Sequence, residues 1–280
     1  MSEVHHFRRV TLIWLLASVI ATPLVVFVFA PTVPPGQGSV QASGQVQDNT
    51  VLFGLSTPIA LSVLVFFGYS LIVFRERNPA SALEGPAIRG HAAVQLWWLI
   101  VTTSVVLFLA GYATYRTLVD GAGGGQGPNP IANPATSSTG PALQVQVIGQ
   151  QWAFTYRFPG YGGVETPHLE LPADRLVEFH VTSLDVVHSF WAYQLGVKAD
   201  ANPGFDNVAF VKTRGPLTFN IHCVELCGVW HGYMFDSGRV VPSADFTTWI
   251  KQQQLRYAPA TKALPPYTKN YFPDPQRRGG

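Results

Sequence analysis

Three long runs without a charged side chain constrain the fold of this 280-residue chain more than any other feature. They are Val10–Ala30, Val51–Phe74 and Ala92–Tyr115, with 21, 24 and 24 residues. A helix rises about 1.5 Å per residue, so each run can cross a hydrocarbon core of about 30 Å. We therefore predict that residues 1–116 form a transmembrane helical region in membrane lipid, with spans at about 10–30, 51–74 and 92–115.

The first run allows two interpretations. A signal peptide has an apolar region of about 7 to 15 residues followed by a cleavage site of small residues, and Val28-Phe29-Ala30 resembles such a site. Pro31 follows immediately, however, and the run is long enough to span. We favour an uncleaved span, and the sequence leaves open whether the mature protein has two spans or three.

Arginines predict the orientation of the spans. The loop 31–49 has no Lys or Arg, whereas basic residues precede the first run and occupy the connection between the next two: Arg8, Arg9, Arg75, Arg77 and Arg89. Because positive charge collects on the cytoplasmic side, the chain after Arg116 is expected on the outer face. We predict a multi-pass protein of a bacterial-type plasma membrane.

The rest of the chain divides by composition. Residues 117–142 are rich in Gly, Pro, Ser and Thr, which predicts a flexible linker. Residues 143–257 show alternating apolar residues in short runs between turns, which is typical of an antiparallel sandwich or barrel. Residues 258–280 are a Pro-rich, basic tail.

Two elements within residues 143–257 are predicted in more detail. Arg175–Ser183 alternates so that one face of a strand is apolar, which places His180 on the other face, toward solvent. Ser243 can cap a helix through about Leu255, with an apolar stripe formed by Phe246, Trp249 and Ile250.

Charge separates the body of this region from the tail. Leu143–Asp245 contains ten acids and six bases, and Phe246–Gly280 contains six bases and one acid. An acidic body would attract a basic partner protein. No nucleic-acid partner is expected.

The segment His222–Met234 contains both cysteines of the chain, together with a histidine and the only methionine besides Met1. These residues are Cys223, Cys227, His231 and Met234. Thiolate, imidazole and thioether form the soft ligand set that selects copper. A structural disulfide or a Cys/His zinc site would leave Met234 unused.

The number of copper ions follows from how the ligands are used. A mononuclear blue-copper site needs two histidines, one cysteine and a weak methionine, which His188, Cys227, His231 and Met234 supply. Cys223 then has no role. If both thiolates instead bridge two coppers, one coordination position remains open, and the main-chain carbonyl of Glu225 can close it.

The pattern Cys-x-Glu-x-Cys-Gly-x-x-His-x-x-Met, with Asp-Val-x-His upstream, resembles the copper A centre of cytochrome c oxidase subunit II. The resemblance extends from the membrane segments to about Val241. It implies a cupredoxin-like Greek-key β-barrel anchored by N-terminal transmembrane helices, with metal ligands in loops at one end. It also implies the subunit at which electrons from cytochrome c enter a proton-translocating oxidoreductase and pass to haem in subunit I, where oxygen is reduced to water.

The resemblance also implies roles for particular residues. Trp152 stands where electrons enter, Asp185 matches an acid involved in donor docking, and the side chain of Glu225 would help to bind magnesium shared with subunit I. Arg157 departs from the family pattern, because an acid is common there. The implied ligands of a binuclear copper centre are His188, Cys223, Glu225, Cys227, His231 and Met234.

Other functions remain open at this stage. The chain could be the copper A subunit of a nitric oxide reductase, or a membrane-tethered mononuclear blue-copper electron carrier. A copper chaperone would need exposed, exchangeable ligands, and the quinol-oxidase subunits of this fold lack the copper ligands that are present here.

Overall fold

A computed structural model describes residues 3–34, 36–75, 90–120, 123–132 and 141–263. The chain divides into two compact units. One comprises Met1–Val33 and Val46–Thr114, and the other comprises Pro34–Gln45 and Tyr115–Gly280. We describe each unit by itself.

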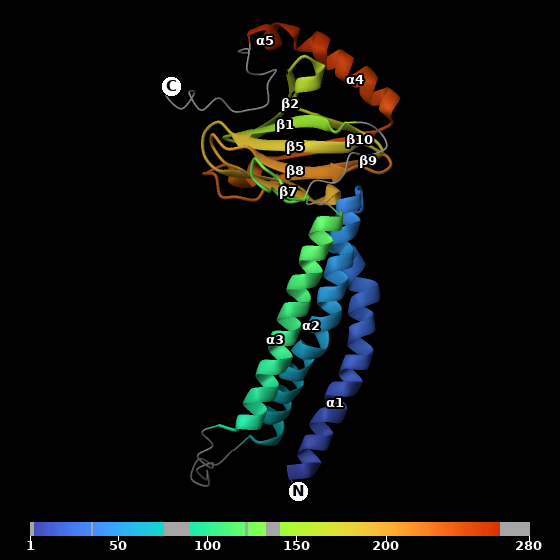
Figure 1. Ribbon diagram of the computed structural model, residues 1–280, viewed down its shortest axis with the longest axis vertical. Coiled ribbons are helices and arrows are strands. Elements are labelled where there is room, and N and C mark those ends of the chain that lie inside the picture. Colours follow the sequence, from blue (N-terminus) through green and yellow to red (C-terminus); the bar gives the residue numbers. More distant parts are fainter. Residues whose placement is uncertain (1–2, 35, 76–89, 121–122, 133–140, 264–280) are drawn as a thin grey trace. The chain divides into compact units, whose positions relative to one another are not determined.

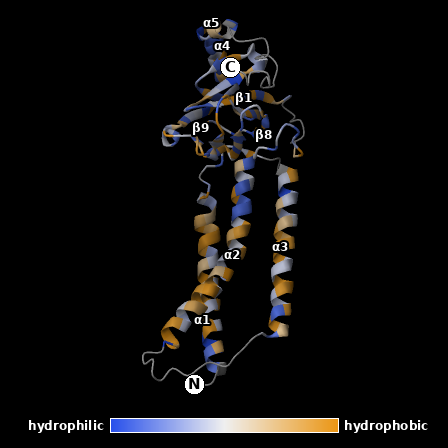
Figure 2. Cartoon of the chain, turned by 90° about the vertical axis from the view of Figure 1, so that its left-hand side faces the viewer, coloured by the Kyte–Doolittle hydropathy of each residue, from blue (hydrophilic) through white to orange (hydrophobic). Residues whose placement is uncertain are grey.

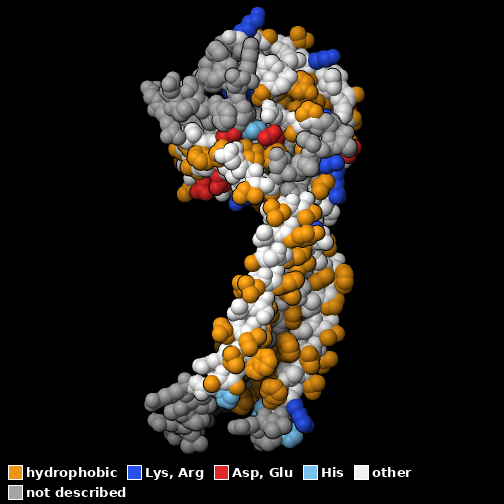
Figure 3. Space-filling view, in the orientation of Figure 1, with side chains coloured by type: hydrophobic (Ala, Val, Ile, Leu, Met, Phe, Trp, Pro, Cys, Tyr) orange, Lys and Arg blue, Asp and Glu red, His pale blue; other side chains and the backbone are white. Residues whose placement is uncertain are grey.

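The first unit is helical. Helix α1 (Glu3–Leu24) continues through a π-helical turn (Val25–Phe29) and a 3-10 turn (Ala30–Thr32). Helices α2 (Val40–Val73) and α3 (Ala92–Asp120) follow (Figure 1). All three are long and apolar enough to cross a membrane. Figure 2 shows hydrophobic residues along most of their length, and Figure 3 shows hydrophobic side chains over their surface.

Several contacts join the helices of this unit, and two hydrogen bonds illustrate them. The indole Nε1 of Trp14 in α1 donates a hydrogen bond of 2.8 Å to the carbonyl of Pro58 in α2. The hydroxyl of Tyr112 in α3 donates one of 3.1 Å to Asp48 in α2. Apolar helices in a membrane associate through such hydrogen bonds and through close packing of their side chains.

The helix boundaries differ from the sequence prediction. Helix α2 begins at Val40, within a stretch predicted to be a loop, and α3 continues to Asp120, beyond the predicted end at Tyr115. The polar residues at the start of α2 lack the apolar pattern by which the span was recognised, so hydropathy could not place this boundary. The arginine-bearing connection at 76–89 lies outside the described residues.

The described residues of the second unit form ten strands in two five-stranded sheets. One sheet has the order β3-β2-β1-β5-β8 and the other β4-β10-β9-β6-β7. Figure 1 shows β1, β5 and β8 side by side. The strands are β1 (Leu143–Gln150), β2 (Ala153–Phe158), β3 (Val164–Thr166), β4 (Leu169–Pro172), β5 (Leu176–Ser183), β6 (His188–Ala192), β7 (Val197–Ala201), β8 (Asn207–Lys212), β9 (Leu217–Cys223) and β10 (Phe235–Val241).

Most neighbouring strands are antiparallel, but β1 pairs with β5, and β4 with β10, in parallel. This mixed arrangement of two packed sheets is a cupredoxin-like β-sandwich, which confirms the predicted fold class. The sequence did not predict β3, β4, β6 and β7, because these runs of 3 to 5 residues are too short to show a clear alternation.

The core lies between the two sheets. Val145 pairs with Phe179 and Val147 with Val181, so the apolar residues of β1 and β5 share one face. All four are fully buried, as is Phe190 from the opposite sheet. The alternation seen in the sequence thus gives the register of these strands, since a shift by one residue would turn the apolar face outward.

Helix α4 (Ser243–Arg256) packs on this domain through the predicted stripe. Phe246 and Ile250 are buried, and Trp249 lies 5.6 Å from Phe158, measured between ring centroids. Ser243 does not cap the helix with its side chain as predicted, because Pro242 occupies the N-cap. The described part of the tail forms the short helix α5 (Ala258–Ala263), and 264–280 lie outside the described residues.

Two segments from outside the predicted domain complete it. The main chain at Gly123–Gly127 exchanges hydrogen bonds with Lys198 of β7 and with Val208 of β8, which are edge strands of different sheets. Residues 36–45 pack on the same unit: Gly38 bonds the carbonyl of Gln194, and Gln41 accepts from the amide of Lys212. Residues 123–127, which lie within the predicted linker, therefore have main-chain hydrogen-bond partners on this unit.

The prediction for His180 is also wrong. Its side chain is only 4% exposed and lies 3.3 Å from Asp206 and 3.4 Å from Glu178. The strand alternation was correct, because His180 does face away from the core. The outer face of β5 is covered there, however, and alternation alone could not show this.

Candidate metal centre

Loops from both sheets meet at one end of the β-sandwich. His188 is the first residue of β6, and Cys223 is the last residue of β9. The loop after β9 supplies Cys227, and a short 3-10 turn (His231–Tyr233) leads to Met234 just before β10. The turn between β1 and β2, which contains Trp152, lies beside this loop.

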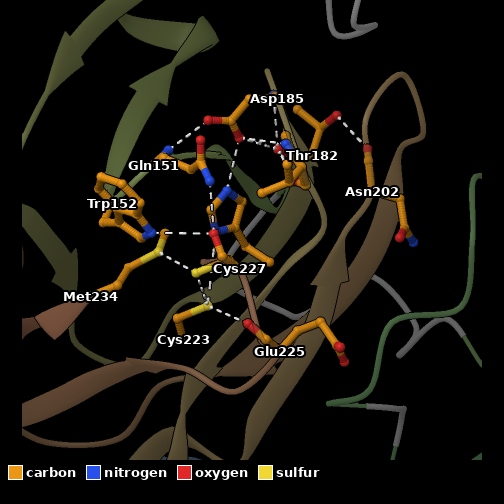
Figure 4. Close-up of polar contacts among 12 residues, drawn as sticks. Gln151, Trp152, Thr182, Asp185, Asn202, Cys223, Glu225, Cys227 and Met234 are labelled. Atoms are coloured by element: carbon orange, nitrogen blue, oxygen red, sulfur yellow. Dashed lines mark hydrogen bonds and ion pairs between the residues drawn. The ribbon is translucent and has the colours of Figure 1, made fainter. Parts of the chain in front are cut away.

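The five side-chain donors predicted from the sequence converge here, as Figure 4 shows for the cysteines and Met234. The two thiol sulfurs are 3.8 Å apart. The sulfur of Cys223 lies 3.9 Å from Nδ1 of His188, and that of Cys227 lies 3.5 Å from Nδ1 of His231 and 3.8 Å from Sδ of Met234. The ligand atoms of His188, Cys223 and Cys227 all lie within 4.8 Å of one another, close enough to share a metal ion.

The carbonyl oxygen of Glu225 also faces this cluster and accepts a hydrogen bond of 3.3 Å from the Cys223 thiol. Its carboxylate points away from the sulfurs (Figure 4) and is exposed to solvent. Each thiol therefore has a histidine nitrogen and one weaker donor beside it. Soft sulfur and imidazole donors in this arrangement fit copper.

Burial shields the cluster from water. His188 is fully buried, and Cys223, Cys227 and Met234 are 7%, 3% and 2% exposed. Both cysteines are free thiols. Burial and the neighbouring Cys223 raise the pKa of Cys227 to about 12. Since a copper ligand must be a thiolate, metal binding releases the proton of Cys227.

A carboxylate and a glycine orient the ring of His188. Its Nε2 lies 2.9 Å from Oδ1 of Asp185, which leaves Nδ1 to face the sulfurs. Gly149 of β1 lies against the other side, where an added Cβ would come within 3.0 Å of the ring. Such a contact between a carboxylate and the outer nitrogen fixes the tautomer and position of a ligating histidine.

The oxygens of Asp185 are turned inward. Besides His188, Asp185 accepts hydrogen bonds from the backbone amides of Gln151 and Val186, at 2.7 Å each. Partial burial works against its charge, but the bonds from His188 and these amides outweigh burial and lower the pKa of Asp185. The sequence suggested a docking acid at this position, and the structure gives the carboxylate a role inside the site.

Trp152 and Gln151 share one acceptor on the ligand loop. The carbonyl of Cys227 accepts a hydrogen bond of 3.2 Å from the indole Nε1 of Trp152 and one of 2.8 Å from Nε2 of Gln151 (Figure 4). Gly228 follows with φ at +120°, and a Cβ there would lie 3.0 Å from Nε2 of Gln151. A residue without a side chain is therefore needed for this close approach.

The side chains of two other histidines point away from the cluster. His180 is paired with carboxylates on the outer face of β5. His222 stacks on Tyr193 with ring centroids 5.8 Å apart and is exposed. Sequence reasoning missed Gln151, because its partners are 34 and 76 residues away and no local pattern marks them.

The fold and this donor set define the chain as a protein with apolar helices and a cupredoxin-like domain whose His/Cys/Cys cluster suits copper. A model of the family "Cytochrome C oxidase subunit II, periplasmic domain" matches residues 164–237, which include all six predicted ligand positions. Trp152 lies outside the matched part.

Curated relatives match over most of the chain. Cytochrome c oxidase subunit 2 of Thermostichus vulcanus is 27% identical over 82% of this chain and 81% of its own length. The protein of the same name from Synechocystis sp. is 26% identical over 70% of this chain and 68% of its own length. A solved periplasmic domain of subunit II from Bradyrhizobium japonicum aligns with 41% of this chain and 95% of its own length, at 28% identity and a TM-score of 0.40.

The resemblance stated from the copper motif is confirmed by the family match and the curated relatives: the chain is homologous to subunit II of cytochrome c oxidases. These relatives are subunits of cytochrome c oxidases, and the three apolar helices of this chain are long enough to cross a membrane.

Proposed function

We propose that this chain is the subunit at which electrons enter a respiratory haem-copper oxidase. Two copper ions would be held by His188, Cys223, Glu225, Cys227, His231 and Met234, the set implied by the sequence. The observation that carries this proposal is the pairing of donors: two thiols 3.8 Å apart, each with one histidine nitrogen and one weaker donor within 3.9 Å. A mononuclear site would leave one thiol and one of its neighbours unused.

When bound, such a centre accepts and releases one electron at a time. The protein contributes a rigid, buried set of donors from two loops that the folded sandwich holds together, so that little rearrangement accompanies a change of charge. His188 is held by Asp185, and the sulfurs are shielded by the core. Metal affinity and the stability of the fold are thereby coupled.

Trp152 would receive electrons from cytochrome c. Its ring is half-buried at the surface of the cluster, and its Nε1 donates to the carbonyl of Cys227. The path from the indole to a ligand residue thus runs through one hydrogen bond. Electrons would then pass to haem in subunit I for the reduction of oxygen to water.

Glu225 would serve two partners. Its carbonyl faces the sulfurs and its exposed carboxylate points away from them. The carboxylate is a hard oxygen ligand that suits magnesium, and subunit I would complete such a site. The three apolar helices would make the chain a multi-pass protein of a bacterial-type plasma membrane, with the copper domain outside.

The domains follow the same proposal. Residues 1–116 form the membrane region, 117–142 connect it to the copper domain at 143–257, and 258–280 are a basic tail. Two adjustments to these boundaries follow from the packing. Residues 36–45, within the membrane region, and residues 123–127, within the linker, both pack on the β domain.

The copper proposal is tested on the full-length chain in detergent, because segments before residue 140 pack on the domain. After copper loading, metal content and the electron paramagnetic resonance spectrum are measured. We expect two coppers per chain that share one unpaired electron. One copper with a single-nucleus hyperfine pattern would overturn the binuclear assignment.

The role of Trp152 is tested by Trp152→Phe, which removes the Nε1 donor. We expect an unchanged copper content and slower reduction of the centre by reduced cytochrome c in stopped-flow mixing. Trp249→Phe in α4 is the matched control, because Trp249 is also partly buried but packs against Phe158. Equal reduction rates in the two variants would remove Trp152 from the path.

A further inference from the structure

We infer that Gln151 is a positioning residue for the copper centre, which holds the Cys227 segment against Trp152 and links it to the segment that carries His188. The inference rests on the proposed function and goes beyond it, because the sequence motif and the family match both leave Gln151 without a role. Two separate hydrogen bonds of Gln151 carry it.

The first bond is made by the side chain. Nε2 of Gln151 donates a hydrogen bond of 2.8 Å to the carbonyl oxygen of Cys227, which also accepts a hydrogen bond from Trp152. A carbonyl with two donors is held in place along two directions. The Cys227 sulfur, which lies next to His231 and Met234, is thereby held as well.

The second bond is made by the backbone. The backbone amide of Gln151 donates a hydrogen bond of 2.7 Å to Oδ2 of Asp185. The other carboxylate oxygen of Asp185 lies 2.9 Å from Nε2 of His188. One residue of the β1–β2 turn thus reaches both ligand segments, 34 and 76 residues further along the chain. Figure 4 shows Gln151 between Asp185 and Cys227.

The surroundings fit a positioning role. Because Gly228 has no side chain, there is room for the side-chain amide of Gln151; an added Cβ would lie 3.0 Å from its Nε2. Gln151 itself is solvent-exposed over much of its surface and contributes little to the core. Its loss should therefore disturb the centre more than the stability of the domain.

The electrostatic consequence has a definite sign. An N–H dipole directed at a ligand residue stabilises the more electron-rich, reduced state, and hydrogen bonds near the cysteine sulfur tune the reduction potential of copper sites. Removing the Nε2 donor should lower the reduction potential. It should also loosen the contact between Trp152 and Cys227 and slow the arrival of electrons.

The test uses Gln151→Met in the full-length, copper-loaded chain. Methionine has a similar length and no charge, lacks the donor, and leaves the backbone bond to Asp185 intact. Gln254→Met is the matched control, because Nε2 of Gln254 also donates 2.8 Å to a backbone carbonyl, that of Tyr161, away from the cluster. Both variants are compared by reduction potential, electron paramagnetic resonance and reduction by reduced cytochrome c.

We expect Gln151→Met to bind as much copper as the unmodified chain, with a lower reduction potential and a changed hyperfine pattern. Its reduction should be about fivefold to tenfold slower, the factor that one net hydrogen bond of roughly 1 to 1.4 kcal/mol represents. Gln254→Met should match the unmodified chain. Identical potentials, spectra and rates for the two variants would overturn the inference.

Loss of copper from Gln151→Met is also interpretable. If the metal-free variant unfolds at the same temperature as Gln254→Met, the loss supports a positioning role. If it unfolds at a clearly lower temperature, Gln151 is a structural residue and the inference fails. Failure of the unmodified chain to bind copper would instead count against the proposed function.

Discussion

Two buried histidines, His188 and His180, lie beside carboxylates in the same β domain, yet only one belongs to the candidate metal centre. His188 is 2.9 Å from Asp185 and faces two thiols with its other nitrogen. His180 has Asp206 at one nitrogen and Glu178 at the other, at 3.3 and 3.4 Å. Burial and a carboxylate partner are common to both, so neither identifies a ligand.

The difference is in what the second nitrogen meets. In His188 it is left to a cluster of soft donors, whereas in His180 it meets a second acid. Two acids favour the protonated imidazolium, which cannot bind a metal ion. Although burial opposes the charge, Asp206 and Glu178 raise the pKa of His180. The surroundings of His188 suit a metal ion, and those of His180 suit a buried ion pair.

The largest expected effect distinguishes the two histidines directly. His188→Gln should abolish the binuclear copper signal, because the imidazole donor next to Cys223 is lost. His180→Gln should retain the full copper content. Copper analysis and electron paramagnetic resonance on both full-length variants measure this. A normal copper signal in His188→Gln would break the comparison.

The next effect concerns the carboxylates. Asp185→Asn should weaken copper binding by about 10- to 100-fold, because the partner that orients His188 becomes a neutral amide. Asp206→Asn, the corresponding change beside His180, should leave copper affinity unchanged. Competition with a copper chelator measures both affinities. Equal losses in the two variants would mean that Asp185 acts only through the fold.

A third effect separates the histidines by pH. His180→Gln should destabilise the domain by about 1 to 3 kcal/mol, because the buried Asp206 and the partly buried Glu178 lose a hydrogen-bonding partner. The folded pKa of His180 is raised, so its stabilisation is fully present below the unfolded value of about 6.5 and is lost as pH rises through the folded pKa. The difference in unfolding temperature between the unmodified chain and His180→Gln should therefore shrink from about pH 5.5 to about pH 8.5.

The exposed His168 provides the control for this pH series. His168→Gln should unfold at the same temperature as the unmodified chain at each pH. Near-ultraviolet circular dichroism of the full-length chain follows the unfolding of the β domain. A stability difference for His180→Gln that grows with pH would contradict the assigned direction.

The smallest effect concerns the ring of His188 alone. Gly149→Ala adds a Cβ 3.0 Å from the ring, so the ring must shift by a few tenths of an ångström. We expect a retained copper centre with a small change in its absorption and hyperfine splitting, measured on the copper-loaded chain. Gly160→Ala, where no atom lies within 4 Å of an added Cβ, should leave the spectra unchanged.

The sequence predicted those parts of the molecule whose cause is local. Uncharged runs gave the three apolar helices, alternation gave the buried faces of β1 and β5, and the contiguous motif gave the donors from Cys223 to Met234. His188 lies 35 residues from the cysteine beside it, outside the contiguous motif, so it was proposed from the need for a second histidine and from the resemblance. The ligand roles themselves stay predictions until copper is measured.

What the sequence could not predict depends on distant contacts. The alternation pattern places His180 on the face that is usually exposed. It is buried because the outer face of β5 is covered there, which the alternation cannot show. The inward turn of Asp185 depends on His188 and on the amide of Gln151, which lies 34 residues earlier. The start of α2 was obscured because its polar residues pack on the β domain, where hydropathy gives no signal.

The packing of residues 36–45 makes the copper domain discontinuous in the chain. Residues 46–114, which include most of α2 and α3, form an insertion within it. Ser39 bonds the carbonyl of Leu195, 156 residues later, so the first piece of the domain is synthesised long before its partner. Contacts between residues so far apart in the sequence slow folding. The β domain is therefore completed only after the helices between its two pieces have been made.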